Sequence, residues 1–185
     1  MRKLLLLSCT ALLLAVAVYA DELPLPAPLR AGAHLITLPF KVALLSARQP
    51  DEKLAVPVAV VKVSQIGNSW HAPRTGGRRH EGQDIFAKRG TAVYSATEGY
   101  VVRIGENSLG GQTVWVLGAG GRSYYYAHLD AYATGLAVGD HVTPATVLGY
   151  VGTTGNAAGT QPHLHFGVYT SDGALDPRPL LIDRL

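Results

Sequence analysis

Short runs of β-branched and aromatic residues alternate with glycine-containing turns from Lys53 to the end of the chain. Runs this short and evenly spaced, with no helical period between them, predict an all-β domain built from antiparallel sheets. The expected strands are residues 54–63, 99–104, 113–117, 123–128, 147–151 and 164–169. Residues 118–121 read Gly-Ala-Gly-Gly, so the two strands that flank them should form a hairpin.

Residues 1–20 have the pattern of a secretory signal peptide. Arg2 and Lys3 precede an apolar run over residues 4–18, and Ala20 ends the segment just before Asp21. This order of positive charge, apolar run and small residue predicts cleavage after Ala20. The mature protein is therefore expected in the periplasm or cell envelope, with retention of the run as an anchor as the alternative.

Cleavage at this point changes what the composition implies. It removes Cys9, the single cysteine, so the mature protein has neither a disulfide nor a thiol nucleophile. The 16 basic residues less Arg2 and Lys3 leave 14 against 13 acidic ones, a net charge of +1. The basic isoelectric point is therefore no argument for nucleic-acid binding.

Residues 21–52 form a proline-rich N-terminal arm ahead of a single compact domain at residues 53–185. Pro24, Pro26 and Pro28 disfavour a helix or a central strand, so the arm should begin as an extended segment. Residues 35–45 are apolar enough to pack on the domain as a strand. The arm could act as a spacer, cover the functional site or dock another envelope protein.

The residues most suited to chemistry are His80, Asp84, His128, His163 and His165. His163 and His165 should face the same side of a predicted strand, because side chains two residues apart in a strand do so. Imidazole nitrogen and carboxylate oxygen are ligands of catalytic zinc, which takes three protein ligands and keeps one open position. Two residues then remain for proton transfer, since an imidazole titrates at about 6.5.

His128 ends a run of three tyrosines in the predicted strand 123–128. At a spacing of two, Tyr124, Tyr126 and His128 should share one face of this strand. The tyrosines are typical strand residues, although one of them could line a groove.

Four segments form a set in this order: HEGQDIFAKRGTAVYSATEGYVV, YYYAHL, GLAVGDHVTPATVLGYVGTTGN and PHLHFGVY. Together they resemble the lysostaphin-type, LytM-like zinc metalloendopeptidases, over roughly residues 53–180. The resemblance implies a duplicated hybrid motif of the barrel-sandwich kind that hydrolyses peptidoglycan stem peptides or cross-bridges. It also implies that His80, Asp84 and His165 bind one Zn²⁺ ion, and that His128 and His163 transfer protons in unassigned roles.

The segment before His80 departs from this family. Some relatives carry a tyrosine there that is thought to assist the transition state, whereas residues 71–79 contain none. Basic residues flank His80 instead: Arg74, Arg78, Arg79, Lys88 and Arg89. They could steer the carboxylates of wall peptides, or form a solvated charged loop.

His80 and Asp84 require a bend in the chain if they bind one ion. A straight strand would place their Cα atoms about 13 Å apart, which is beyond comfortable reach for two ligands of one metal. Gly82 is the expected hinge, because glycine tolerates backbone angles that other residues avoid.

Other functions remain open at this stage. A non-catalytic regulator that activates another wall hydrolase is the main alternative, and a metallopeptidase with a different substrate is the second. Glycine-rich hairpins also resemble lipoyl-type carrier modules, but no lysine follows Arg89 to carry the modification.

Overall fold

The computed structural model describes residues 27–184. The predicted signal peptide and the prolines at positions 24 and 26 lie outside the described residues. Among the helices in the described part, none is both long and apolar enough to cross a bilayer.

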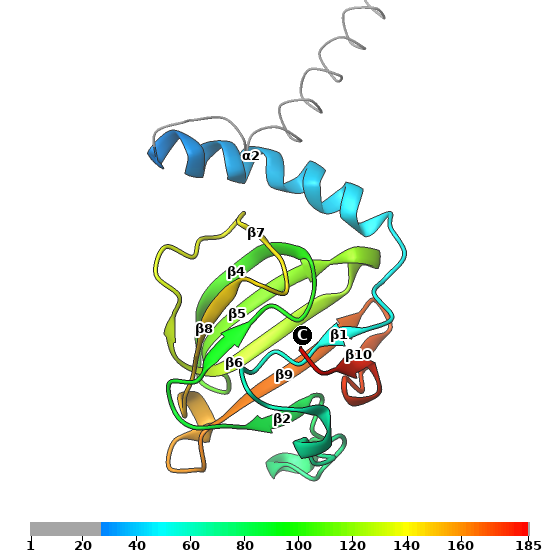
Figure 1. The fold of residues 1–185 in the computed structure, drawn as a ribbon, viewed down its shortest axis with the longest axis vertical. Helices are drawn as coiled ribbons and strands as arrows, with labels where there is room; N and C mark the ends of the chain where they lie inside the picture. The colour runs from blue at the N-terminus through cyan, green and yellow to red at the C-terminus, as the bar shows by residue number, and fades with distance from the viewer. Residues whose placement is uncertain (1–26, 185) are drawn as a thin grey trace, which may run out of the picture.

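The core of the fold is a nine-stranded antiparallel sheet, as the strand pattern predicts (Figure 1). Its main path runs β10-β9-β6-β5-β4-β7, while β2 pairs with β9 and β8 pairs with both β3 and β6. The strand bounds are β2 Gln83–Phe86, β3 Ala92–Tyr94, β4 Gly99–Asn107, β5 Gly111–Gly118, β6 Ser123–Tyr132, β7 His141–Val142, β8 Val147–Val151, β9 His163–Thr170 and β10 Gly173–Leu175.

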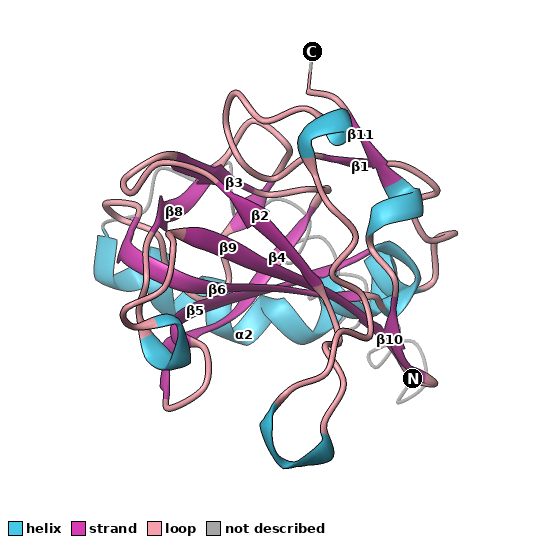
Figure 2. Cartoon of the chain, turned by 90° about the horizontal axis from the view of Figure 1, so that it is seen from below, coloured by secondary structure: helices cyan, strands magenta, loops and turns pink. Residues whose placement is uncertain are grey.

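The predicted hairpin is confirmed, because β5 and β6 pair antiparallel on either side of a short 3₁₀ turn, η3 (Ala119–Gly121). A second, two-stranded sheet joins β1 (Leu54–Ala55) in parallel to β11 (Leu181–Ile182) (Figure 2). The prediction of one strand over residues 54–63 is wrong beyond Ala55. Pro57 lacks an N–H for a strand ladder, and Val60 has a φ of 59°, so the chain turns there.

Strand β6 lies at the centre and organises the site. One of its edges pairs with β5. Its other edge is divided: residues up to Ala127 pair with β9, and residues from Leu129 onward pair with β8. The division falls at His128, where Ala127 and His128 together lie opposite Thr113 of β5. This is a β-bulge, which commonly redirects side chains near functional sites.

Along each strand, every second side chain points to the same face of the sheet, and the side chains on one face form the buried core. Tyr124 and Tyr126 of β6 and Phe166 and Val168 of β9 are fully buried. The bulge ends this alternation before His128, so the expectation that Tyr124, Tyr126 and His128 share one face is wrong. Tyr125 instead lines the same pocket as His128.

The described part of the N-terminal arm is helical from Ala27 to Ser46, which corrects the extended conformation expected at Pro28 and the strand expected over residues 35–45. Residues 35–45 are not a strand but part of helix α2 (Ala27–Ser46). Pro28 is tolerated because the first turn of a helix needs no N–H from it. Thr37, Lys41 and Leu45 are buried at a spacing of four, which is the period of a helix face packed on the sheet.

Helix α2 crosses the end of the sheet formed by β4, β5 and β7, and β2 lies at the opposite end (Figure 1). The ammonium of Lys41 lies 5.6 Å from the centre of the Tyr100 ring on β4. Helix α2 therefore covers the β4, β5 and β7 end of the sheet and not the β2 end.

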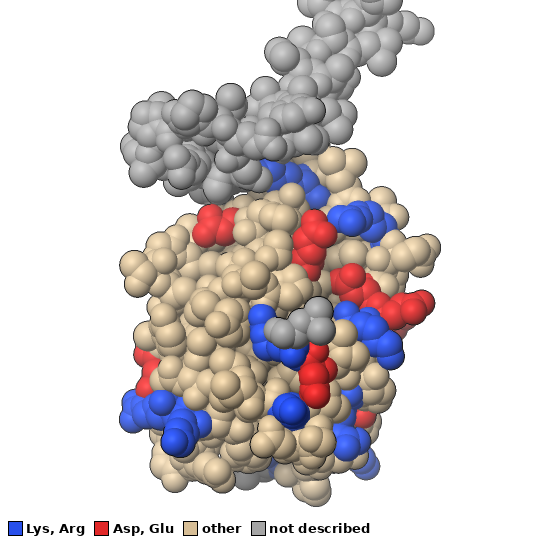
Figure 3. All heavy atoms as spheres, viewed as in Figure 1, with Lys and Arg blue, Asp and Glu red and all other residues tan. Residues whose placement is uncertain are grey.

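On the face seen in Figure 3, basic side chains are scattered among acidic ones and form no continuous band.

Three further short 3₁₀ turns lie in the loops before β2 or near the C-terminus: η1 Val63–Gln65, η2 Thr75–Gly77 and η5 Arg178–Leu180. A fourth, η4 (Gly155–Ala157), follows β8 and contacts β5 and β6. The loops that carry η2 and η4 contribute the walls of the pocket described next.

Candidate metal centre

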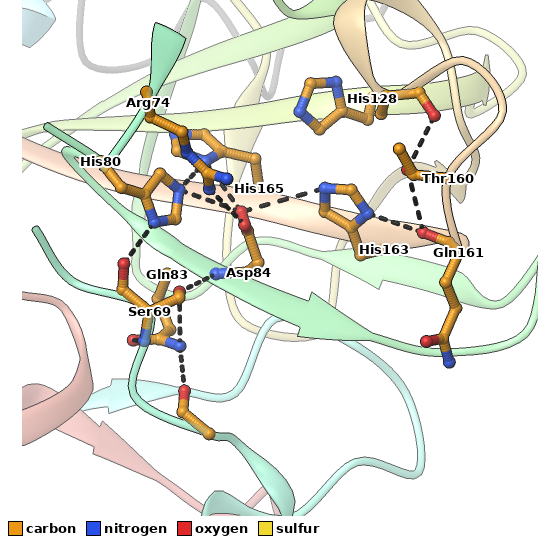
Figure 4. Close-up of polar contacts among 12 residues, drawn as sticks. Ser69, Arg74, His80, Gln83, Asp84, His128, Thr160, Gln161, His163 and His165 are labelled. Carbon is orange, nitrogen blue, oxygen red and sulfur yellow. Dashed lines mark hydrogen bonds and ion pairs between the residues drawn. The ribbon is translucent and has the colours of Figure 1, made fainter. Parts of the chain in front are cut away.

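His80, Asp84 and His165 bring three potential ligand atoms together (Figure 4). His80 Nε2 lies 2.8 Å from His165 Nδ1 and 3.0 Å from Asp84 Oδ1. His165 Nδ1 lies 3.1 Å from the same carboxylate oxygen. The three atoms therefore form a nearly regular triangle.

Strand pairing explains why two of these residues meet. Asp84 on β2 and His165 on β9 are direct partners in the antiparallel ladder, and directly opposite side chains lie on the same face. His80 precedes β2 and is held by backbone hydrogen bonds to the loop before it. Its N–H donates to Ala72 at 3.0 Å, and its carbonyl accepts from His71 at 2.9 Å.

Ser69 fixes the orientation of two members of the triangle. Its carbonyl lies 2.7 Å from His80 Nδ1, and a carbonyl can only accept, so Nδ1 carries the proton and Nε2 presents its lone pair. The Ser69 hydroxyl accepts hydrogen bonds from the Asp84 N–H and the Gln83 side-chain amide, both at 2.9 Å. These contacts stabilise the turn that brings His80 back to Asp84.

The triangle fits a zinc ion by size and by donor type. Ligand atoms about 2.0–2.1 Å from a tetrahedral zinc are separated by about 3.3 Å, close to the observed separations of 2.8–3.1 Å. Two imidazole nitrogens and one carboxylate oxygen form an ordinary ligand set for catalytic zinc. The residues present can therefore hold one divalent ion.

Charge states at the triangle also suit a cation. Burial alone would raise the pKa of Asp84, but its contacts with the His165 and His80 imidazoles outweigh burial and lower the pKa well below the usual range. Burial lowers the pKa of His165, which favours the neutral imidazole. An ionised carboxylate and a neutral imidazole are the forms that bind metal.

Gly82 has a different role from the one the sequence indicates. Its φ is not among the positive values in the described chain, so the bend needs no left-handed residue. A Cβ at this position would instead lie 2.5 Å from His165 Cε1 and 2.9 Å from the Phe166 carbonyl oxygen. The His165 ring packs directly on the Gly82 backbone, and that contact requires glycine.

Replacing Gly82 with valine should displace the His165 imidazole and lower the zinc content of the purified protein. Overpacking of this kind also destabilises a fold by about 1–3 kcal/mol. Zinc per chain by elemental analysis and thermal unfolding would measure both effects. Gly105→Val is the matched control, because a Cβ at Gly105 meets nothing within 4 Å. Full metal content and activity in Gly82→Val would refute this role.

His128 and His163 stand beside the triangle as a second pair. Their ring centres are 5.0 Å apart, and His163 Nε2 lies 3.9 Å from Asp84 Oδ1. His128 Nδ1 lies 2.9 Å from the Thr154 carbonyl, and His163 Nδ1 lies 2.8 Å from the Gln161 carbonyl. Both Nδ1 atoms are therefore protonated donors in the neutral rings, and both Nε2 atoms are left to accept a proton.

His128 has a backbone φ of 65°, which is rare for a residue other than glycine. Its N–H donates to the Gly110 carbonyl at 2.7 Å, which helps to hold this conformation. Burial, followed by the neighbouring imidazoles of His163 and His165, lowers the pKa of His128 to about 4. The ring is therefore neutral near neutral pH.

All five predicted residues line one pocket of about 660 Å³. Leu164, between the two histidines of β9, is fully buried, as the alternation predicts. Of the flanking basic residues, Arg74, Arg78 and Arg79 line the pocket. Lys88 and Arg89 do not, and Arg89 pairs with Asp130 instead. The fold thus places three of the five predicted basic residues at the pocket and the other two outside it.

Sequence reasoning missed three features of the site. Ser69 carries no sequence signal, because its role depends on a backbone carbonyl. Arg74 donates to the second oxygen of Asp84 at 2.6 Å, which only the folded loop shows. Trp115 packs between Tyr125 and Tyr169, with ring centres 4.4 and 5.5 Å apart, and the three line the pocket. Alternation along β5 could have indicated Trp115.

The fold and site match a known family. The model of Peptidase family M23 matches residues 78–177, which include all five site residues. The chain belongs to this family.

Three similar proteins illustrate the match. The chain is 40% identical over 138 residues to an L-Ala–D-Glu endopeptidase of Bacillus subtilis, covering 69% of this chain and 42% of that protein. The catalytic domain of lysostaphin from Staphylococcus simulans superposes with a TM-score of 0.55 at 29% identity, over 63% of this chain and 92% of that one. A zinc-containing peptidase from Vibrio cholerae superposes with a TM-score of 0.56 at 25% identity, and the match covers 69% of this chain and 39% of that one.

The chain spans less than half the length of the curated relatives it matches, 42% of the Bacillus subtilis protein and 22% of lysostaphin.

Proposed function

We propose that the chain is an exported, zinc-dependent endopeptidase that hydrolyses peptide bonds in peptidoglycan stem peptides or cross-bridges. The observation that carries this proposal is the triangle of His80 Nε2, Asp84 Oδ1 and His165 Nδ1, with two oriented imidazoles beside it in the same pocket. The peptidase names of its relatives, and the zinc of the Vibrio cholerae protein, support the choice of reaction and metal.

A zinc ion held by three protein ligands supplies Lewis-acid activation of a substrate carbonyl and of a water molecule. The remaining groups of the pocket perform the proton transfers. One Nε2 of the His128 and His163 pair accepts the proton of the attacking water. The imidazolium so formed then donates that proton, directly or through the other ring, to the leaving amine, and both rings return to the neutral form. The Thr154 and Gln161 carbonyls keep each ring in the tautomer that these steps require.

The substrate proposal follows the similarity to wall endopeptidases. The L-Ala–D-Glu endopeptidase, at 40% identity, acts on a bond to D-glutamate according to its name, and lysostaphin is a further match. The walls of the pocket are polar and aromatic, with three arginines, and suit an anionic peptide. An exported enzyme would meet such peptides in the cell envelope.

Digestion of purified peptidoglycan tests the proposal. Zinc-loaded protein should release new amino termini, chelation should abolish the release, and added zinc should restore it. Mass spectrometry of the released fragments would identify the scissile bond. No new termini from zinc-loaded protein, together with stimulation of a second wall hydrolase, would favour the non-catalytic regulator.

A further inference from the structure

The loop between His71 and His80 forms a small hairpin at the mouth of the pocket. Pro73 and Arg79 pair as an isolated antiparallel bridge, and the Arg74 N–H donates to the Arg78 carbonyl at 2.9 Å. Gly76 and Gly77 have φ values of 74° and 73°, which allow the tight turn at its tip. The hairpin therefore has a defined shape that holds its arginines close together.

Arg74 contacts one of the candidate metal ligands directly (Figure 4). Its Nη2 lies 2.6 Å from Asp84 Oδ2, while Oδ1 of the same carboxylate faces the histidines. Its side chain is 41% exposed, whereas that of Asp84 is 10% exposed. A guanidinium has five N–H donors, and the contact with Asp84 engages one side of it. Asp84 thus fixes the position of Arg74, which lines the pocket and keeps further N–H groups to donate to a ligand there.

The charge around this part of the pocket is positive. Arg78 and Arg79 also line it and are exposed. The acidic residues that line it are Glu81 and Asp84, and Asp84 is already paired with Arg74. A planar, bidentate guanidinium matches a carboxylate better than it matches a neutral amide. The hairpin therefore favours a ligand that carries a free carboxylate.

We infer that Arg74, Arg78 and Arg79 form a carboxylate subsite that selects peptides with a free carboxylate next to the scissile bond. The inference rests on the proposed function only for which peptide bond is cleaved. The preference for a carboxylate rests on the hairpin and its arginines alone. Arg74 is the central member, because Asp84 places it beside the candidate metal ligands. Arg78 and Arg79 line the same pocket and add positive charge to it.

Two matched peptides would test the subsite: an L-Ala–D-Glu peptide with a free glutamate carboxylate, and its twin in which that carboxylate is an amide. Hydrolysis is measured on wild type, Arg74→Ala and Arg89→Ala. Binding of both peptides is measured by calorimetry on the same set in a zinc-loaded His128→Ala background, so that one readout is independent of turnover. Arg89→Ala is the control, because it removes the same charge from a residue outside the pocket.

Wild type should prefer the carboxylate peptide by about 10- to 100-fold, the range expected for a charged hydrogen bond. Zinc is supplied in excess, because Arg74 is an outer partner of Asp84 and its loss should weaken zinc binding. Under these conditions Arg74→Ala should lose the preference through weaker binding of the carboxylate peptide alone, and Arg89→Ala should keep it. Equal losses for both peptides in Arg74→Ala would overturn the subsite, as would an equal effect of Arg89→Ala.

The two readouts separate the subsite from the proposed function. Selective, Arg74-dependent binding without hydrolysis by wild type would support the subsite and contradict the endopeptidase. Hydrolysis of both peptides at equal rates would support the endopeptidase and overturn the subsite.

Discussion

Replacing His128 with alanine should lower kcat/KM for wall peptides by about 10²- to 10⁴-fold, the range for loss of a general acid or base. Zinc content should remain that of wild type, because His128 is not among the three residues whose ligand atoms converge. Its Nδ1 is engaged by the Thr154 carbonyl, and its φ of 65° places the ring beside the triangle and not within it.

The measurement combines kinetics with elemental analysis on the same preparation. His141→Ala is a suitable control, because His141 is a surface histidine paired with Glu98 outside the pocket. It should retain both zinc and activity. Loss of zinc from His128→Ala to the same extent as from a ligand variant would show that the division between ligands and proton-transfer residues is wrong.

Replacing His165 with alanine should remove both zinc and activity. His165 supplies one corner of the triangle, and its loss leaves His80 and Asp84 as the remaining predicted ligands. Loss of an outer partner of a metal ligand already weakens binding by about 10- to 100-fold, so loss of a ligand should weaken it by more than about 100-fold. Asp84 would also lose an imidazole contact that lowers its pKa.

Competition with a chromogenic chelator would measure this loss as a change in zinc affinity. Circular dichroism would confirm that the sheet is intact, since His165 is followed by Phe166, which stays in the core. Wild-type zinc affinity in His165→Ala would contradict the ligand set.

Much of the fold could be predicted because it follows from local alternation. The strand expected over residues 147–151 has the same bounds as β8, and the hairpin across residues 118–121 is present. Helix α2 could not be predicted from apolar content alone. Where burial is described, its buried positions are Thr37, Lys41 and Leu45, two of them polar, so this part of the helical face lacks a continuous apolar stripe.

The sequence could predict that the five residues gather in one site, but not the contacts that position them. The spacing of His163 and His165 fixes their common face by strand geometry alone, whereas the position of His128 depends on a bulge that alternation does not foresee. The sequence indicates Gly82 as a hinge with free backbone angles, whereas the structure shows that glycine is needed there for the close contact with His165. Ser69 and Arg74 act through tertiary contacts, so spacing gives no signal for them.

The most direct test of the account is anomalous diffraction at the zinc edge from crystals of the zinc-loaded protein. We expect one peak within about 2.0–2.2 Å of His80 Nε2, Asp84 Oδ1 and His165 Nδ1, with His128 and His163 beyond bonding distance. A loaded crystal with no peak at this triangle, or with a zinc ion bound by His128 or His163, would contradict the account.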